Sequence, residues 1–111
     1  MAEELVPIFR VDDAAVAVAW YRRLGFDPIG EHRFAPGLPL YVYLRRGAVH
    51  LHLSEHDGDA PPRSVAYFYV DEIASIADEF DVMVETKPWA LEVELTDPFG
   101  NRLRIGQPTE R

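Results

Sequence analysis

Two short patterns carry the side chains best suited to chemistry, His50-x-His52 and Arg102-x-Arg104. Side chains alternate between the two faces of a β-strand, so each pair would project from one face of its strand. An imidazole is the usual acid or base near neutral pH and a common metal ligand, whereas a guanidinium binds oxygen acceptors. Both patterns point to a polar site, although paired histidines also occur as hydrogen-bonding groups in pockets or as exposed strand residues.

The sequence around these patterns leaves two alternatives open. Glu55, His56 and Asp57 follow the histidines and add potential metal ligands. A His-x-His pair alone is nevertheless a weak metal signal, because one strand supplies only two of the three or four ligands that a site needs. The arginines lie next to a predicted strand that contains Glu92 and Glu94. Ion pairs with these carboxylates are the alternative to ligand binding.

The elements that position these patterns occur twice. Residues 8–21 (IFRVDDAAVAVAWY) and 67–80 (YFYVDEIASIADEF) match at an offset of 59. Each copy is an alternating strand, an acidic helix start and an amphipathic helix. Further strands are expected at 27–32, 40–45 and 48–54, and again at 82–86, 91–96 and 101–106.

The polar, proline-rich segment 56–64 is typical of a linker between the two copies. The sequence therefore predicts an α+β fold of two βαβββ modules, 1–55 and 65–111, with curved mixed sheets around a cup. Residues 1–111 would form a single domain, because neither half could bury its sheet alone.

Alternation also predicts which side chains line the cup. The large apolar residues of each strand should cover the helices and leave the others on the opposite face. The expected wall is apolar and aromatic with a few polar groups, as in most small-molecule sites. It consists of Val6, Ile8, His50, His52, Val65, Tyr67, Tyr69, Arg102 and Arg104. A dimer interface or plain solvent contact is the alternative role of this face, since Tyr and Arg are also enriched at interfaces.

The composition excludes several classes of site. The 111 residues include no cysteine, which rules out disulfides, zinc–thiolate sites and thiol nucleophiles. The net charge is −8, so nucleic acid is not an expected partner. This charge would attract a cationic ligand, or it only keeps the protein soluble. The N-terminal residues resemble neither a signal peptide nor a membrane anchor, so we expect no membrane contact and a cytoplasmic location.

Three stretches resemble one known superfamily: VPIFRVDDAAVAVAWYRRLGF (6–26), SVAYFYVDEIASIADEF (64–80) and PWALEVELTDPFGN (88–101). They are similar to the vicinal oxygen chelate superfamily, also called the glyoxalase/bleomycin resistance protein/dioxygenase superfamily. The PW–E–DP–GN series is most similar to the bleomycin resistance proteins.

Enzymes of this superfamily hold a divalent metal with side chains from the first and last strand of each module. The matching positions here are Val6, His52 or His50, Val65 and Arg104. Valine has no lone pair to donate and arginine is a donor without an acceptor. The resemblance therefore implies a lost metal site and no cofactor.

Bleomycin resistance proteins are homodimers that sequester the drug without chemistry in clefts between the subunits. The resemblance implies a homodimer whose N-terminal strand crosses to the partner, hinged at Pro7. The positions that match the aromatic ligand contacts are Phe34, Tyr67 and Trp89. The segment 81–88 is shorter than its counterpart in the bleomycin-binding members, which leaves bleomycin itself open and a small planar ligand as the broader expectation.

We therefore predict a non-catalytic protein that sequesters an antibiotic of the bleomycin type or another planar metabolite in a metal-free cup. The predicted ligand-binding residues are Phe34, His50, His52, Tyr67, Tyr69, Trp89, Arg102 and Arg104. One alternative is a metal-independent enzyme with His52 as base and Arg104 as oxyanion stabiliser. The other is a dimeric protein whose cup is vestigial.

Overall fold

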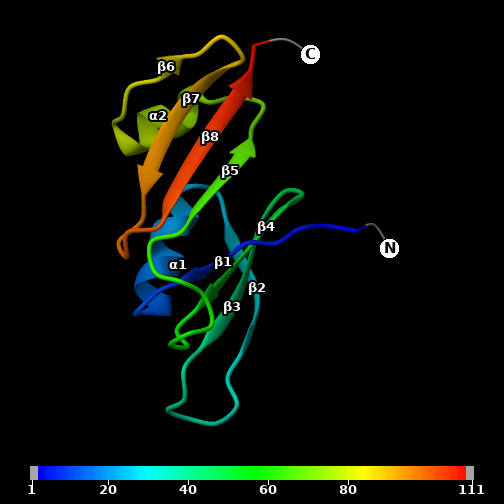
Figure 1. Ribbon diagram of the computed structural model, residues 1–111, viewed down its shortest axis with the longest axis vertical. Helices are drawn as coiled ribbons and strands as arrows, with labels where there is room; N and C mark the ends of the chain where they lie inside the picture. The colour runs from blue at the N-terminus through cyan, green and yellow to red at the C-terminus, as the bar shows by residue number, and fades with distance from the viewer. Residues whose placement is uncertain (1–2, 110–111) are drawn as a thin grey trace.

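The computed structural model describes residues 3–109 and contains two modules with the same order of elements (Figure 1). The first comprises β1 (Ile8–Arg10), α1 (Ala14–Arg23), β2 (Asp27–His32), β3 (Tyr41–Arg46) and β4 (Val49–Ser54). The second comprises β5 (Val65–Tyr69), α2 (Ala74–Phe80), β6 (Glu85–Thr86), β7 (Ala90–Thr96) and β8 (Arg102–Pro108). The predicted α+β fold of two βαβββ modules is confirmed.

The main difference between the predicted and the observed strands lies at 82–86. β6 contains only Glu85 and Thr86, which pair with β7. The apolar residues before it, Val82 and Val84, pack against the hydrophobic core instead. Their spacing of two therefore reflects burial on one side of an extended segment and not strand pairing.

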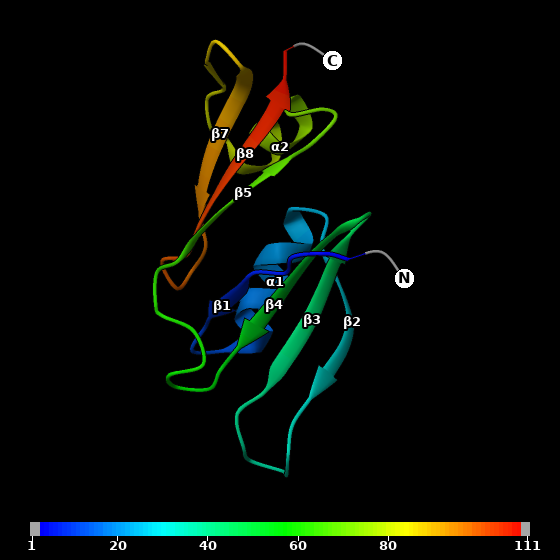
Figure 2. The same cartoon turned by 45° about the vertical axis from the view of Figure 1, so that its right-hand side comes forward.

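Each module forms one four-stranded mixed sheet, in the order β1-β4-β3-β2 and β5-β8-β7-β6 (Figure 1 and Figure 2). The first strand of each module pairs in parallel with the last, with Ile8 opposite His52 and Val65 opposite Arg102. The other neighbouring strands are antiparallel. This topology places the histidines on β4 and the arginines on β8, each of which lies between two other strands of its sheet.

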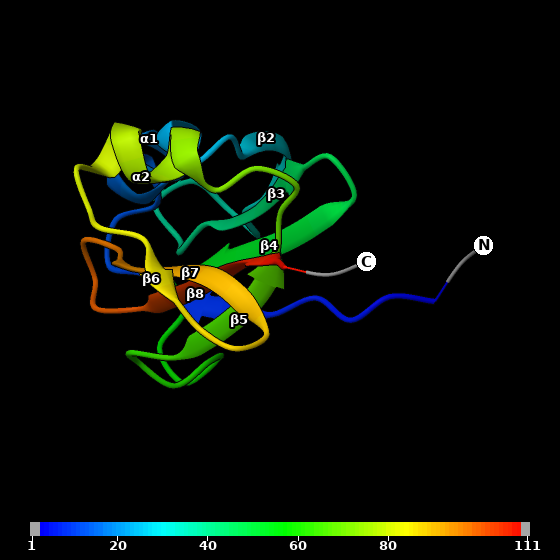
Figure 3. The same ribbon diagram turned by 90° about the horizontal axis from the view of Figure 1, so that it is seen from above.

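The two helices lie on the same side of the sheets (Figure 3). α1 begins after Asp13, whose carboxylate accepts hydrogen bonds from backbone N–H groups of the first turn. The helices meet where Arg23 forms an ion pair with Glu79 at 2.9 Å and where Trp20 packs on Phe80 with ring centroids 5.2 Å apart. Neither helix in residues 3–109 is long and apolar enough to cross a membrane. We call the side of each sheet opposite the helices its open face.

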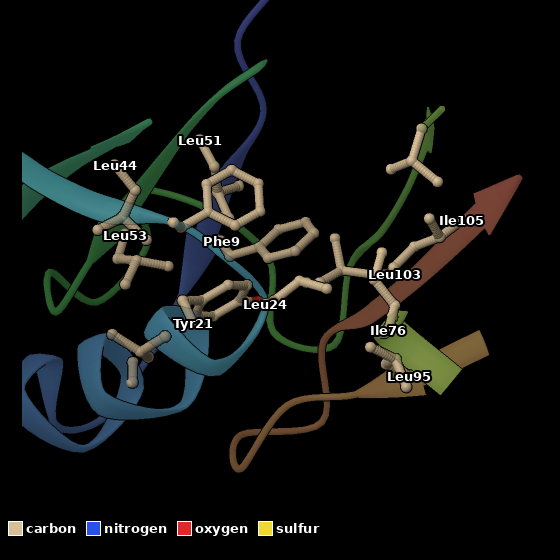
Figure 4. Close-up of a cluster of buried hydrophobic side chains, with 14 of the residues drawn as sticks. Phe9, Tyr21, Leu24, Leu44, Leu51, Leu53, Ile76, Leu95, Leu103 and Ile105 are labelled. Atoms are coloured by element: carbon tan, nitrogen blue, oxygen red, sulfur yellow. The ribbon is translucent and has the colours of Figure 1, made fainter. Parts of the chain in front are cut away.

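One hydrophobic cluster fills the space between the helices and both sheets (Figure 4). It contains Phe9, Tyr21 and Leu24 of the first module together with Leu103 and Ile105 of the second. Burial of such side chains stabilises the fold by roughly 1.5–3 kcal/mol each. The modules therefore share one core.

Hydrogen bonds reinforce the contact between the modules at the turn after β7. The Tyr21 hydroxyl donates to Asp97 Oδ2 at 2.8 Å, and the Asn101 side-chain amide donates to the same oxygen at 3.0 Å. Asn101 also donates to the backbone carbonyl of Arg10 and accepts from the backbone N–H of Ser64. Because Tyr21, Asp97 and Asn101 are buried, this network fixes the DPFGN turn against α1 and β1.

Candidate ligand-binding surface

The histidine and arginine patterns lie on the open faces, as strand alternation predicts. The strand residues that face the helices are buried: Leu51, Leu53, Leu103 and Ile105. Between them, His50 and His52 are half-buried, and Arg102 and Arg104 are exposed. Tyr67 and Tyr69 of β5 are exposed as well. The structure therefore presents the expected side chains on two open faces, one on each sheet.

On the second sheet, Glu92 of β7 joins three residues singled out by the sequence. Its Oε2 accepts from the Tyr67 hydroxyl at 2.7 Å and from the Trp89 indole Nε1–H at 2.9 Å. Its Oε1 lies 3.4 Å from Nη2 of Arg104. Glu92 is only 4% exposed, whereas Trp89 is 57% exposed. We call Tyr67, Trp89, Glu92 and Arg104 the Glu92 cluster, in which the covered carboxylate holds side chains that remain open to solvent.

Contacts within the Glu92 cluster shift two pKa values in opposite directions. Hydrogen bonds from Tyr67 and then Trp89 hold the pKa of Glu92 below its usual value. Burial of the Tyr67 hydroxyl raises its pKa most, and the hydrogen bond to Glu92 raises it further, to about 12. At neutral pH Glu92 is therefore ionised and Tyr67 protonated, which is the state in which the hydroxyl donates to the carboxylate.

Gly106 of β8 makes room for the Tyr67 ring. It lies opposite Glu92 in the β7–β8 register and opposite Tyr69 in the β5–β8 register. A methyl group added at Gly106 would overlap with the Tyr67 hydroxyl. The missing side chain therefore allows Tyr67 to extend across β8 and reach Glu92, a close approach of the kind that favours glycine within a strand.

The two arginines form the ion pairs that the sequence left as an alternative. Arg102 Nη1 lies 3.2 Å from Glu94, and Arg104 Nη2 lies 3.4 Å from Glu92. Arg104 nevertheless keeps 46% of its side chain exposed, and its guanidinium carbon lies 5.7 Å from the centroid of the Tyr67 ring. A guanidinium has five N–H donors, so Arg104 retains donors for a ligand.

On the first sheet, His52 lies beside two tyrosines that the sequence analysis missed. The Tyr41 hydroxyl is 2.8 Å from Nδ1 of His52. Tyr43 lies opposite His52 in the β3–β4 register, and the rings meet edge to face at 4.8 Å. Burial lowers the pKa of His52 and raises the pKa of Tyr41. The alternation in LYVYLR, with Val42 and Leu44 buried, is the signal that would have identified both tyrosines.

Phe34 borders a hollow of 550 Å³ at the end of the first sheet. Its ring lies edge-on to His32 at 4.5 Å and to His56 at 6.4 Å. The hollow is lined by His32, Phe34, Tyr41, Tyr43, His56, Asp57, Gly58 and Asp59. The loop after β2 thus places Phe34 beside the tyrosines of β3. Of these residues, Phe34 alone was predicted from the sequence as a ligand contact.

Other predicted residues border two different hollows. One of 160 Å³ lies between the modules, where His50 and Tyr67 meet the N-terminal segment that contains Leu5 and Pro7. The other, of 340 Å³, is bordered by Arg104 and lies over β6 and β7. Within a single chain, the predicted ligand contacts therefore do not line one continuous cavity.

The N-terminal segment before β1 runs away from the body of the molecule (Figure 3). Leu5 is 96% exposed, and Glu4 lies 3.8 Å from Nε2 of His50. The chain joins the sheet at Pro7, whose carbonyl accepts from the backbone N–H of His52 at 3.0 Å. The position predicted as a hinge is thus the point where the N-terminal segment joins β4.

The positions that match metal ligands in the superfamily do not suit a metal ion. Val6 and Val65 have no donor atom, and Arg104 is itself a cation. His52 remains, but its Nδ1 is already hydrogen-bonded to Tyr41. In the part of the chain that the structure describes, no group of three or more His, Asp or Glu side chains could hold a metal ion.

Comparison with known proteins matches a family over nearly the whole chain. A model of this family, described as glyoxalase superfamily protein, covers residues 1–110. A search of curated proteins finds no match. The evidence for the family from sequence comparison therefore rests on the family model.

Several solved structures share the fold. A bleomycin-binding protein complexed with bleomycin gives a TM-score of 0.74 at 23% identity, over 96% of this chain and 98% of that one. A glyoxalase-related enzyme from Clostridium phytofermentans gives 0.78 at 20% identity, over 97% and 96%. TnmS3, an antibiotic binding protein from Streptomyces sp. CB03234, gives 0.70 at 21% identity, over 98% and 99%. At these identities the likeness concerns the fold.

Proposed function

The chain belongs to the glyoxalase superfamily, and from this premise we propose that it binds a planar organic ligand, an antibiotic or a flat metabolite, without converting it. The observation that carries this proposal is the Glu92 cluster, in which Trp89 is 57% exposed and yet hydrogen-bonded in place. An aromatic face that is both exposed and fixed is suited to stacking on a flat ring. The fold shared with a bleomycin-binding protein and with TnmS3 supports the same kind of ligand.

The proposed ligand contacts come from both open faces. Those predicted from the sequence are Phe34, His50, His52, Tyr67, Tyr69, Trp89, Arg102 and Arg104. The structure adds Tyr41 and Tyr43, because both border the same hollow as Phe34. A mixed wall of aromatic rings with a few polar groups is typical of small-molecule sites.

The proposed site is completed in a homodimer, in which the open face of the first sheet meets that of the second sheet of the partner. Two observations support this arrangement. Phe34 and Trp89 lie on different modules, and no hollow identified in residues 3–109 of a single chain is bordered by both. In addition, Leu5 is 96% exposed in a segment that leaves the body, as expected for an arm that exchanges at Pro7.

Binding without catalysis is favoured over the metal-independent enzyme for a geometric reason. His52 lies on β4 and bonds Tyr41, whereas Arg104 lies on β8 and bonds Glu92. A base and an oxyanion stabiliser must both lie near one reacting atom. Within one chain the two side chains lie on different sheets, and in the proposed dimer they would meet only across the subunits, where each is already hydrogen-bonded within its own chain, His52 to Tyr41 and Arg104 to Glu92.

A thermal-shift screen tests the proposal directly. Ligands that bind the native state raise the melting temperature by mass action, with about 2.7 kcal/mol gained at a hundred times Kd. Metal-free bleomycin and a panel of flat aromatic compounds should include at least one that raises the melting temperature in a concentration-dependent way. Analysis of the recovered compound by mass spectrometry should show it unchanged. A panel without any shift would support the vestigial cup, and a chemically altered compound would support the enzyme.

A further inference from the structure

We propose that Glu92 is a positioning residue that fixes Trp89 and Tyr67 as a stacking platform, and that Arg104 beside it selects flat ligands with an oxygen acceptor at their edge. The inference rests on the proposed function and deepens it, because it names the class of ligand. It also assigns a role to Glu92, which the sequence analysis considered only as a partner for the arginines.

Glu92 occupies the polar groups of both aromatic rings. Trp89 has a single polar group, the indole N–H, and Tyr67 has a single hydroxyl. Both donate to the same oxygen, Oε2 of Glu92, at 2.9 and 2.7 Å. The polar edges of both rings therefore point to the carboxylate, and what remains for a ligand is aromatic surface. Fixing the rings before binding lowers the entropy cost of ordering them with the ligand.

Glu92 is itself held in place by its neighbours. The residue is 4% exposed although it lies on an open face. Tyr67 covers it because Gly106, directly opposite in the register, has no side chain to keep the ring away. Hydrogen bonds from Tyr67 and Trp89 keep the pKa of Glu92 low, so the acceptor stays ionised at neutral pH. A covered carboxylate that accepts three hydrogen bonds is a rigid support.

Arg104 differs from the other charged side chains around the platform. Nearby side chains form pairs, Arg102 with Glu94 at 3.2 Å and Lys87 with Glu85 at 3.2 Å. Arg104 has one longer contact, 3.4 Å to Glu92, and its side chain is 46% exposed. It is the cation next to the Tyr67 ring with donors left over. A carboxylate or carbonyl on a stacked ring would accept from it, whereas an ammonium at that place would be repelled.

The motion of Trp89 can be measured without any ligand. The positioning role of Glu92 is therefore tested separately from the selection of ligands by Arg104. The chain has two tryptophans, so the Trp20→Phe variant leaves Trp89 as the only indole. Time-resolved fluorescence anisotropy then measures its motion. Glu92→Met, which removes the acceptor but keeps the length of the side chain, should add a fast depolarising motion of Trp89. Glu92→Gln is the matched control, because its one remaining carbonyl oxygen can still accept from both rings.

Binding of two flat probes tests the class of ligand. The probes are 2-naphthoate and 2-naphthylmethylammonium, which share a ring system and differ in charge, measured by calorimetry on the full chain. We expect naphthoate to bind about tenfold more tightly, which corresponds to about 1.4 kcal/mol. Arg104→Gln should bring the two affinities close together. Glu92→Met should weaken both probes, whereas Glu92→Gln should retain naphthoate binding.

Each outcome contradicts a different part of the proposal. If Trp89 moves no faster in Glu92→Met than in the parent, Glu92 does not position it and that half of the inference is overturned. If Trp89 responds as expected but neither probe binds the parent, stacking on the platform is overturned, and the proposed function fails with it only if the thermal-shift panel also gives no shift. Equal or tighter binding of the ammonium overturns the role of Arg104. Should Glu92→Met not fold by circular dichroism, Glu92→Thr replaces it, since threonine suits a strand and is too short to replace the carboxylate.

Discussion

The hydroxyl of Tyr21 in α1 donates a hydrogen bond of 2.8 Å to the carboxylate of Asp97, in the turn that connects β7 and β8. The two residues are 76 positions apart and both are buried. Asp97 also accepts from the backbone N–H groups of Phe99 and Asn101. One buried carboxylate thus organises the turn and binds it to the helix of the other module.

Replacing Tyr21 with phenylalanine should destabilise the protein. The change keeps the buried ring but removes one donor from a buried carboxylate, which typically costs about 1–3 kcal/mol. Urea unfolding followed by circular dichroism should show a lower midpoint with an unchanged slope. Tyr69→Phe is the matched control, because this tyrosine is more than half exposed, and its midpoint should stay close to that of the parent. Equal midpoints for the two variants would contradict a structural role for the Tyr21–Asp97 hydrogen bond.

Stability should fall at alkaline pH. Contacts in the folded chain raise the pKa of Tyr67 from 10.0 to about 12, so between these values the unfolded state loses a proton that the folded state keeps. Unfolding is then favoured as pH rises, and the contribution of Tyr67 is fully present only below about pH 10. Melting temperatures measured from pH 8 to 11.5 should decline less steeply in Tyr67→Phe. An identical decline in both proteins would mean that Tyr67 carries no such shift.

Truncating Trp89 to alanine should weaken ligand binding while the protein still folds. More than half of the residue is exposed, so its removal leaves no cavity in the core, while a stacked ring would lose about 1–3 kcal/mol of contact. With a ligand recovered from the thermal-shift screen, calorimetry should show affinity reduced about tenfold or more. Val16→Ala, an exposed apolar position on α1, should bind as the parent does. Unchanged affinity in Trp89→Ala would place the ligand elsewhere.

The protein should form a homodimer that depends on the N-terminal segment. Leu5 is almost fully exposed in a single chain, and an arm that exchanges would bury it against the partner. Light scattering during gel filtration should give twice the mass of the chain. Leu5→Asp should shift the equilibrium towards monomer, because burial of an unpaired carboxylate is unfavourable. Leu38→Asp serves as a control for an added charge at another exposed leucine. A parent protein that remains monomeric at all concentrations would exclude the proposed site between subunits.

Divalent metal ions should not stabilise the protein. Val6 and Val65 cannot coordinate an ion, and Arg104 would repel it. Addition of Mn²⁺, Ni²⁺ or Zn²⁺ to protein treated with a chelator should leave the melting temperature unchanged. His50→Ala and His52→Ala should behave alike in this assay. A clear increase that disappears in one histidine variant would show a metal site that involves His50 or His52.

The fold was accessible from the sequence because its signals are local. Alternation in HLHL and NRLRI correctly separated the buried leucines from His50, His52, Arg102 and Arg104. The repeat at an offset of 59 correctly predicted two modules of the same topology. The strand predicted at 82–86 was too long, because Val82 and Val84 bury their side chains without pairing as a strand. Tyr41 and Tyr43 were missed although the same alternation rule applied to them.

The sequence by itself determined which residues face the helices and which face away, since a period of two or of 3.6 is set by the backbone of each element. Tertiary structure decided which of these outward residues meet, apart from the arginine–glutamate pairs that the neighbouring strands in the sequence already suggested. Tyr67, Glu92 and Arg104 come from three strands, and only their register across the sheet and the space above Gly106 bring them together. Hydrogen bonds act over about 3 Å, so partners 25 positions apart, such as Tyr67 and Glu92, are decided by how the strands pair and not by local pattern.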